Sequence, residues 1–401
     1  MPDATIDEVT TTRGPHYEPF GWHHWPEHPW LSYQFRRQLG ETQEGAGAVS
    51  ECFQAASRMV PGDEESWHTE WMRVADRNRI RGDEAEADGN VFTAKACWLR
   101  ATNYYRSAEF WLAADDPRRL ATFDRCEEVF AKAGRYFEVP IEQVKVPYED
   151  GAHLHAHFVR APRADAKSPV LIAFGGVDSF KEELLFMVGR ASLERGISCL
   201  LVDGPGQGAT LRREKIPNRF DYEVPVGYCI DYLETRDDVD LERIALSGSS
   251  LGGYYAGRAG SFEHRLAAVV SHGAIWSIES FWGNADESHG LAGHIKWVFG
   301  TDSVAAALEK GKEFDLEGAL GNMQCPYLIV HGGHDVLGVT QAELVYNHAK
   351  ESGVDATLKL FPEEETGAEH CQHDNPSIGM DYVADWLAQR FGIDQAALAQ
   401  A

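Results

Sequence analysis

The sequence has little positive charge. Its 401 residues include 37 Lys and Arg against 63 Asp and Glu, which gives a net charge of −26 at pH 7. Nucleic acids and anionic membranes attract the opposite charge. We therefore expect no nucleic-acid partner and no membrane partner, and a small-molecule substrate that is not strongly anionic.

Long apolar runs and paired cysteines are also absent. No stretch of about 18 apolar residues occurs, so no membrane-spanning helix is expected. The first residues are acidic and lack the basic start and apolar stretch of a signal peptide. The seven cysteines are scattered without a Cys-x-x-Cys pair, which favours reduced thiols. These features predict a cytoplasmic protein, and we expect no metal and no other cofactor.

The pattern of apolar residues changes near residue 140. Before it, apolar residues recur every three or four positions, as at Trp67, Trp71 and Val74, which is typical of helices. After it, short apolar runs alternate with helical segments, which indicates a largely parallel sheet with helices on both faces. We predict an α/β fold with a helical N-terminal domain (1–140) and a sheet-based domain (141–401). The segment 276–320 is too long for a simple crossover, so we expect a helical insertion or a long surface excursion.

One segment combines a strand, a tight turn and a helix around a serine. An apolar run ending at Leu246 leads into Gly248-Ser-Ser-Leu-Gly252, and a helix-compatible segment follows. This order is typical of the nucleophile elbow of α/β hydrolases. Ser250 is the serine of this cluster that has glycine two residues before and two residues after it. Ser250 is therefore the predicted nucleophile.

An acid and a histidine follow Ser250 in the chain order that α/β hydrolases use. Asp335 lies in a glycine-rich loop after an apolar run and can orient a histidine. His370 and His373 lie between the last predicted strand and the last predicted helix. We favour His370 as the base because it comes first after the turn at Gly367, and His373 is the alternative.

Two glycine-rich loops lie near these residues. An oxyanion hole needs two backbone N–H groups, one of them from the residue after the nucleophile, Leu251. The loop after the first parallel strand supplies the other, and either Gly176 or Val177 is expected to donate it. The second loop, 203–210, lacks the Lys and the glycine spacing of phosphate-binding loops. It is predicted to be a turn near the pocket without a catalytic role.

These motifs occur together with a helix of characteristic sequence, Leu99-Arg-Ala-Thr-Asn-Tyr-Tyr-Arg106, and with Glu369-His370-Cys371. From about Trp22 to Trp386 the chain resembles the 2,6-dihydroxypseudooxynicotine hydrolase group of α/β hydrolases, which includes a fungal polyketide-shortening hydrolase. The resemblance implies an α/β-hydrolase fold over 141–401, with the helical domain as a cap over the site. It also implies a homodimer.

The same resemblance implies the reaction, which is hydrolysis of a C–C bond beside a ketone, on an aromatic or polyketide-like substrate. A glutamate after the elbow is expected to bind substrate, and Glu279 is the nearest match. Tyr105 and Trp276 belong to a group of aromatic candidates for the pocket wall, although core packing is an alternative role for each. The full group is Trp22, Trp25, Tyr104, Tyr105, Trp276 and Trp282.

Two other functions compete with C–C hydrolysis. A carboxylesterase for aromatic or polyketide-like esters would use the same three residues. A ligand-binding protein on a hydrolase scaffold would not use them at all. The intact set of Ser250, Asp335 and His370 disfavours the binding protein, because degenerate scaffolds often lose one member.

Overall fold

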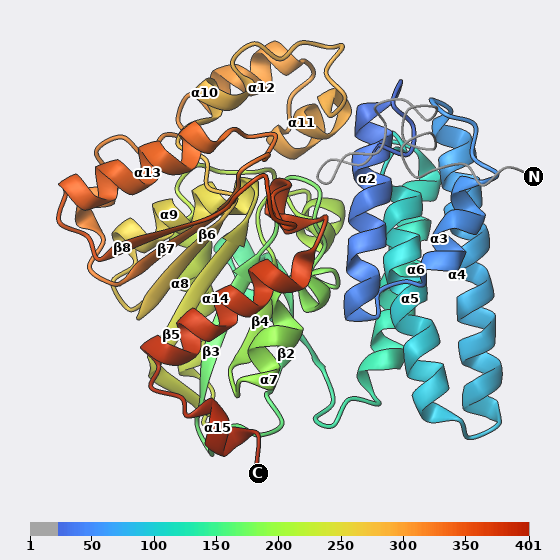
Figure 1. Cartoon of the computed structure of the whole chain (residues 1–401), viewed down its shortest axis with the longest axis horizontal. Coiled ribbons are helices and arrows are strands. Elements are labelled where there is room, and N and C mark those ends of the chain that lie inside the picture. Colours follow the sequence, from blue (N-terminus) through green and yellow to red (C-terminus); the bar gives the residue numbers. More distant parts are fainter. Residues whose placement is uncertain (1–22, 401) are drawn as a thin grey trace, which may run out of the picture.

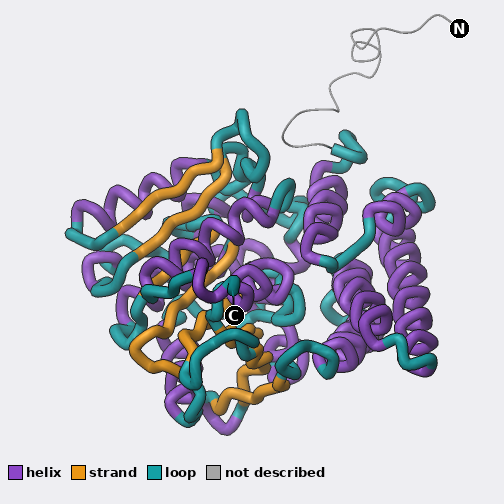
Figure 2. Tube along the Cα trace, turned by 60° about the horizontal axis from the view of Figure 1, so that its bottom comes forward, coloured by secondary structure: helices purple, strands orange, loops and turns teal. Residues whose placement is uncertain are grey.

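The structure, a computed structural model, describes residues 23–400. Helices alone form the first part of the described chain, and Figures 1 and 2 show them as a bundle beside the strands. Helix α6 begins at Pro117, where the carboxylate of the preceding Asp116 accepts the N–H of Arg118. The helices of this part are α2 (Pro29–Gly40), α3 (Val49–Ala56), α4 (Glu64–Ala87), α5 (Val91–Glu109) and α6 (Pro117–Gly134).

The rest of the chain forms one eight-stranded sheet in the order β1-β2-β4-β3-β5-β6-β7-β8. β1 and β2 form an antiparallel hairpin, β2 is antiparallel to β4, and all other pairs are parallel. The strands are β1 (Glu142–Pro147), β2 (His153–Val159), β3 (Ser168–Phe174), β4 (Ser198–Asp203), β5 (Val239–Ser249), β6 (Ala268–His272), β7 (Tyr327–Gly332) and β8 (Ala356–Phe361).

Apolar side chains cover both faces of this sheet, because successive residues of a strand point to opposite sides. In β3, Leu171 and Ala173 belong to a core shared with the helical part, while Val170 and Ile172 belong to the core of the other face. The first face carries α7 (Arg190–Glu194) and α14 (Pro376–Arg390), and the second carries α8 (Glu223–Glu234), α9 (Leu251–Phe262) and α13 (Val339–Glu351). This is the α/β-hydrolase fold that the sequence predicts.

The segment 276–320 connects β6 to β7. It contains three short helices, α10 (Ile278–Trp282), α11 (Ala292–Phe299) and α12 (Val304–Gly311). Figure 1 shows α11 close to α2 of the helical part, and Trp30 of α2 packs its ring 5.4 Å from that of His289. None of the described helices is long and apolar enough to cross a membrane.

The tight turn between β5 and α9 requires glycine, which has no Cβ atom, at two positions. A Cβ atom added at Gly248 would lie 1.8 Å from the carbonyl oxygen of Gly252, and one added at Gly252 would lie 2.6 Å from that of Gly175. Both contacts are with backbone atoms, so relieving either clash would require the strand, the helix or the loop to shift. Strand, helix and the loop after β3 therefore meet at these two glycines.

We expect Gly248→Ala to lower the free energy of unfolding by about 3 kcal/mol, the upper range for overpacking. Urea denaturation of the purified protein measures this change. Gly293→Ala in α11 is the matched control, because nothing lies within 4 Å of its added Cβ atom; it should leave stability unchanged or raise it by up to about 1 kcal/mol. Equal stability of the two variants would contradict this account of the turn.

Candidate active site

Ser250 occupies a backbone conformation that few non-glycine residues adopt. It lies between the end of β5 and the start of α9, with φ 60° and ψ −122°. Such a conformation costs on the order of 1–3 kcal/mol and persists only where the surroundings enforce it. The N–H of Ser250 donates to the carbonyl of His272 at 2.8 Å, which ties the turn to the end of β6. The hydroxyl thus projects from the carboxyl ends of the parallel strands.

The structure brings Ser250, His370 and Asp335 together. His370 Nε2 lies 2.9 Å from Ser250 Oγ, and His370 Nδ1 lies 2.8 Å from Asp335 Oδ1. With the proton on Nδ1, the imidazole donates to Asp335 and accepts the hydroxyl proton of Ser250. His370 therefore contacts Ser250, whereas the alternative, His373, packs its ring against Tyr33.

Asp335 and His370 shift each other's pKa. Burial alone raises the pKa of Asp335, but the charges of His370 and His331, together with the hydrogen bonds from His370 and from the N–H of Leu337, outweigh burial and hold that pKa well below its ordinary value. Burial alone lowers the pKa of His370, but Asp335, through its charge and its hydrogen bond, and the neighbouring Cys371 together outweigh burial and hold that pKa well above its ordinary value. Asp335 also accepts the N–H of Leu337 at 2.8 Å. The carboxylate is thus fixed in position and ready to stabilise an imidazolium.

Two backbone N–H groups near Ser250 lack an acceptor. Within residues 23–400, no hydrogen-bond acceptor takes the N–H of Val177 or of Leu251, the first residue of α9. The N–H of Gly176 is engaged, because it donates to Ser179 Oγ at 3.0 Å. Of the two predicted candidates in this loop, Val177 therefore has the available donor. Gly176 has a steric role, since an added Cβ atom would lie 2.8 Å from Ser250 Cβ.

A small apolar cavity of about 50 Å³ adjoins Ser250. The helical part contributes Trp30 and Tyr33 from α2, and the segment 276–320 contributes Phe281, Trp282 and Leu291. Burial holds the pKa of His373, which also lines the cavity, well below its ordinary value. The other lining residues are Gln34, Arg37, Gly176, Val177, Asp178, Ser179, Met187, Ser249, Ser250, Leu251, Ile275, Val336, Leu337, His370 and Cys371.

Three residues predicted to bind substrate do not line this cavity. Tyr105 points into the helical bundle, where its hydroxyl donates to Asp76 Oδ1 at 2.6 Å. Trp276 stacks on His348 with ring centroids 4.4 Å apart, and Glu279 lies on the exposed side of α10. Their role in substrate binding stays a prediction that this cavity does not support, because sequence position does not reveal which side of a helix faces the pocket. Of the other aromatic candidates, Trp282 lines the cavity, Trp25 and Tyr104 are core residues, and Trp22 lies outside the described residues.

Buried ion pairs join the helical part to the loop after β3. Arg37 of α2 contacts Asp178 at 2.6 Å and Glu183 at 2.6 Å, and Arg106 of α5 contacts the same Asp178 at 3.2 Å. Burial alone raises the pKa of Asp178, but the two arginines outweigh it and hold that pKa well below its ordinary value. Asp178 follows Val177 directly, so these contacts fix the loop that carries the available N–H.

Among residues 23–400, no group of His, Cys, Asp and Glu has the arrangement of a metal site.

We predict that Asp335→Asn lowers the pKa of His370 by about 1 to 3 pH units, because the substitution removes an adjacent opposite charge. An NMR titration of protein with labelled histidines measures this shift. Glu369→Gln is the control: it removes a buried carboxylate that pairs with Arg36 and His334, and His370 should titrate as in the unmodified protein. An unchanged pKa in Asp335→Asn would contradict the coupling.

Known proteins share this architecture. The model of a family described as "Esterase FrsA-like" matches residues 59–289, and that of the prolyl oligopeptidase family matches residues 226–394. "Hydrolase ORFZ" of Pyricularia oryzae is 30% identical over 94% of this chain and 100% of its own length. "20-hydroxy-prefusarin hydrolase FUS2" of Gibberella moniliformis is 33% identical over 75% of this chain and 81% of its own.

A solved structure described as 2,6-dihydroxy-pseudo-oxynicotine hydrolase superposes with a TM-score of 0.74 at 24% identity, over 88% of this chain and 95% of that one. At this identity the likeness supports the fold. The family match covers more than half of the chain, and the curated relatives are named as hydrolases. The chain therefore belongs to the family described as esterase FrsA-like, has the α/β-hydrolase fold, and is a hydrolase.

Proposed function

We propose that the protein is a serine hydrolase that cleaves a C–C bond next to a ketone, with Ser250 as nucleophile, His370 as base and Asp335 as the acid that orients it. The observation that carries this proposal is the hydrogen-bonded chain Ser250–His370–Asp335 beside an apolar cavity. A serine hydroxyl is a weak nucleophile on its own, and an adjacent base held by a third group is the arrangement that activates it.

In the first step, Ser250 Oγ attacks the ketone carbon while His370 Nε2 takes the hydroxyl proton. The carbonyl oxygen becomes an oxyanion, which the N–H groups of Val177 and Leu251 stabilise. Each such donor contributes about 3 kcal/mol to the transition state. Asp335 stabilises the imidazolium that forms.

In the second step, the C–C bond breaks and its electron pair passes to the departing carbon. A second carbonyl group or an activated ring delocalises this charge, and the His370 imidazolium then donates its proton to the departing fragment. Water, activated by His370, hydrolyses the ester on Ser250 and releases a carboxylic acid. The need for a stabilised carbanion limits the substrates to β-diketones and acyl-aromatic compounds.

The cavity wall supports an aromatic or polyketide-like substrate. Trp30, Tyr33, Phe281 and Trp282 offer ring surfaces on which a flat, conjugated molecule can stack. Two relatives are named for small organic substrates, 20-hydroxy-prefusarin and 2,6-dihydroxy-pseudo-oxynicotine. A drug-sized ligand needs about 300 Å³ or more, far above the 50 Å³ of this cavity. We infer that the segment 276–320 moves away from α2 when substrate enters, since buried ion pairs hold α2 in place.

A carboxylesterase is the second candidate. The match to the family described as esterase FrsA-like favours it, and the same residues would release an alcohol in place of a carbon fragment. For either reaction we place the protein in the cytosol. All seven cysteines are free thiols, and thiols stay reduced in the cytosol.

Ser250→Ala should lower kcat by about 10⁴- to 10⁶-fold, because the variant lacks the hydroxyl that attacks the substrate. The same variant should lose labelling by a fluorophosphonate probe. Ser261→Ala, at the other end of α9, is the matched control; its hydroxyl donates to the carbonyl of Gly257 at 2.8 Å, and both activity and labelling should persist. Near-normal turnover by Ser250→Ala would refute the assignment, and an unlabelled native protein without turnover would favour a binding protein.

We expect higher kcat/KM for an aryl 1,3-diketone than for a p-nitrophenyl ester. Turnover of the diketone is followed by release of the carboxylic acid and the methyl ketone in equal amounts. Hydrolysis of the ester with no detectable cleavage of the diketone would establish the esterase in place of the C–C hydrolase. Ser250→Ala should abolish whichever activity is found.

A further inference from the structure

We propose that Gln207 is a positioning residue that aims the N–H of Val177 at the reacting carbonyl oxygen, an inference that rests on the proposed function. Gln207 lies in the glycine-rich loop that follows β4, and its side chain is buried. Its Nε2 atom donates to the carbonyl oxygen of Gly175 at 2.5 Å and to that of Gly176 at 3.0 Å. One side chain thus holds two successive peptide groups of the loop after β3.

The second of these peptide groups contains the available donor. The carbonyl of Gly176 and the N–H of Val177 belong to the same planar trans peptide, in which the two groups point to opposite sides. Gln207 binds the oxygen side, so the N–H of Val177 is directed away from Gln207. The same bond polarises the peptide and strengthens the N–H as a donor.

The first peptide group is held on both sides. Gln207 binds its oxygen, on Gly175, and Ser179 Oγ accepts its N–H, on Gly176. This peptide therefore cannot rotate without losing two buried hydrogen bonds. The next peptide is connected to it through the α-carbon of Gly176, so its rotation is limited as well. One N–H group, that of Val177, is left with its direction set and without an acceptor in the described chain.

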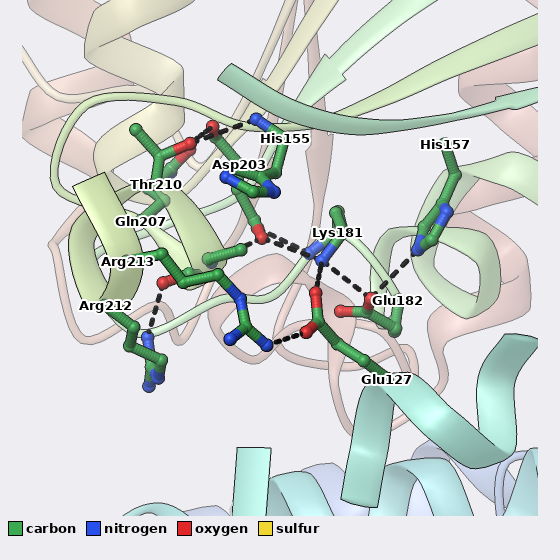
Figure 3. Close-up of polar contacts among 12 residues, drawn as sticks. Glu127, His155, His157, Lys181, Glu182, Asp203, Gln207, Thr210, Arg212 and Arg213 are labelled. Atoms are coloured by element: carbon green, nitrogen blue, oxygen red, sulfur yellow. Dashed lines mark hydrogen bonds and ion pairs between the residues drawn. The ribbon is translucent and has the colours of Figure 1, made fainter. Parts of the chain in front are cut away.

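The amide of Gln207 is itself fixed in orientation. Its Oε1 atom accepts the N–H of Gly204 at 3.1 Å, which identifies the other end of the amide as the donor. The same loop is anchored at Asp203, whose carboxylate accepts the N–H groups of Lys181 and Ala209, both at 2.7 Å. Thr210 Oγ donates to the Asp203 carbonyl at 2.6 Å. Figure 3 shows Gln207 beside this group of polar contacts.

Ion pairs connect Asp203, and with it the loop of Gln207, to the helical part. Lys181 Nζ contacts Asp203 at 3.2 Å, Glu182 at 2.8 Å and Glu127 of α6 at 2.7 Å (Figure 3). Burial alone lowers the pKa of Lys181, but its three carboxylate partners outweigh burial and hold that pKa well above its ordinary value. The ammonium therefore stays charged and bridges the two parts of the chain beneath the loop of Gln207.

Gln207→Met tests this role, because methionine fills a similar volume without a donor. We expect kcat/KM for a p-nitrophenyl ester to fall about 10- to 100-fold, below the roughly 10²- to 10³-fold loss for removal of a direct donor. The loss should lie in kcat, with KM little changed. The affinity for a trifluoromethyl ketone, which forms an oxyanion on Ser250, should fall by a similar factor, whereas affinity for an unreactive substrate analogue should not.

Gln38→Met is the matched control. Gln38 is also a buried glutamine whose Nε2 donates to a backbone carbonyl, that of Ala46 at 3.2 Å, but it lies in α2. This variant should keep its kcat and inhibitor affinity. If Gln207→Met does not fold, as judged by circular dichroism, Gln207→Asn replaces it; the shorter amide cannot reach both carbonyls, and the same loss is expected.

Ser250→Ala, measured alongside, separates the two proposals. An inactive Ser250→Ala together with a Gln207 variant that keeps normal kcat and normal inhibitor affinity would overturn the role of Gln207 alone. An equal loss of affinity for the inhibitor and for the unreactive analogue would also overturn it, because it would indicate general damage to the pocket. An active Ser250→Ala would refute the proposed function instead.

Discussion

Ser250 can hold its left-handed backbone conformation because the turn around it has hydrogens where other residues carry a Cβ atom. Gly248 and Gly252 face each other across the turn, and Gly252 also faces the carbonyl of Gly175 in the loop after β3. The two glycines that permit the strained serine thus also permit the close approach of the loop with the available N–H group. The proposed nucleophile and the proposed oxyanion donors are thus brought together by one steric condition at the carboxyl ends of β3 and β5.

The loop after β3 is held from two directions. Gln207 binds its carbonyl groups from within the sheet-based part, and Arg37 and Arg106 bind Asp178 from the helical part. Buried ion pairs contribute little net stability, since the cost of removing charges from water offsets their attraction. Their value here is geometric, because they fix the helical part, which supplies Trp30 and Tyr33 to the cavity, against the loop beside Ser250. The helices are thereby part of the site.

The sequence was sufficient for residues whose role follows from local pattern and chain order. Ser250, Asp335 and His370 each follow a strand of a parallel sheet, so their order along the chain predicted their meeting. The choice between Gly176 and Val177 needed the hydrogen bond from Gly176 to Ser179, which no pattern reveals. Trp30 and Tyr33 are one turn apart on α2, yet only the packing of that helix identifies their face as the cavity wall. Tyr105 and Glu279 lie away from the cavity wall for the same reason, since aromatic character and linear spacing do not encode the direction of a side chain. Gln207 was missed because its bonds are tertiary, from a side chain to the backbone of another loop.

The central claim is that Ser250 forms a covalent bond to the acyl part of the substrate. Rapid-quench mass spectrometry of the protein during turnover of a p-nitrophenyl ester or an aryl 1,3-diketone tests it directly. The account predicts a mass increase equal to the acyl group, located by peptide mapping at Ser250 and absent from Ser250→Ala. Turnover with no acylated protein, or with the acyl group on another residue such as the neighbouring Cys371, would contradict it.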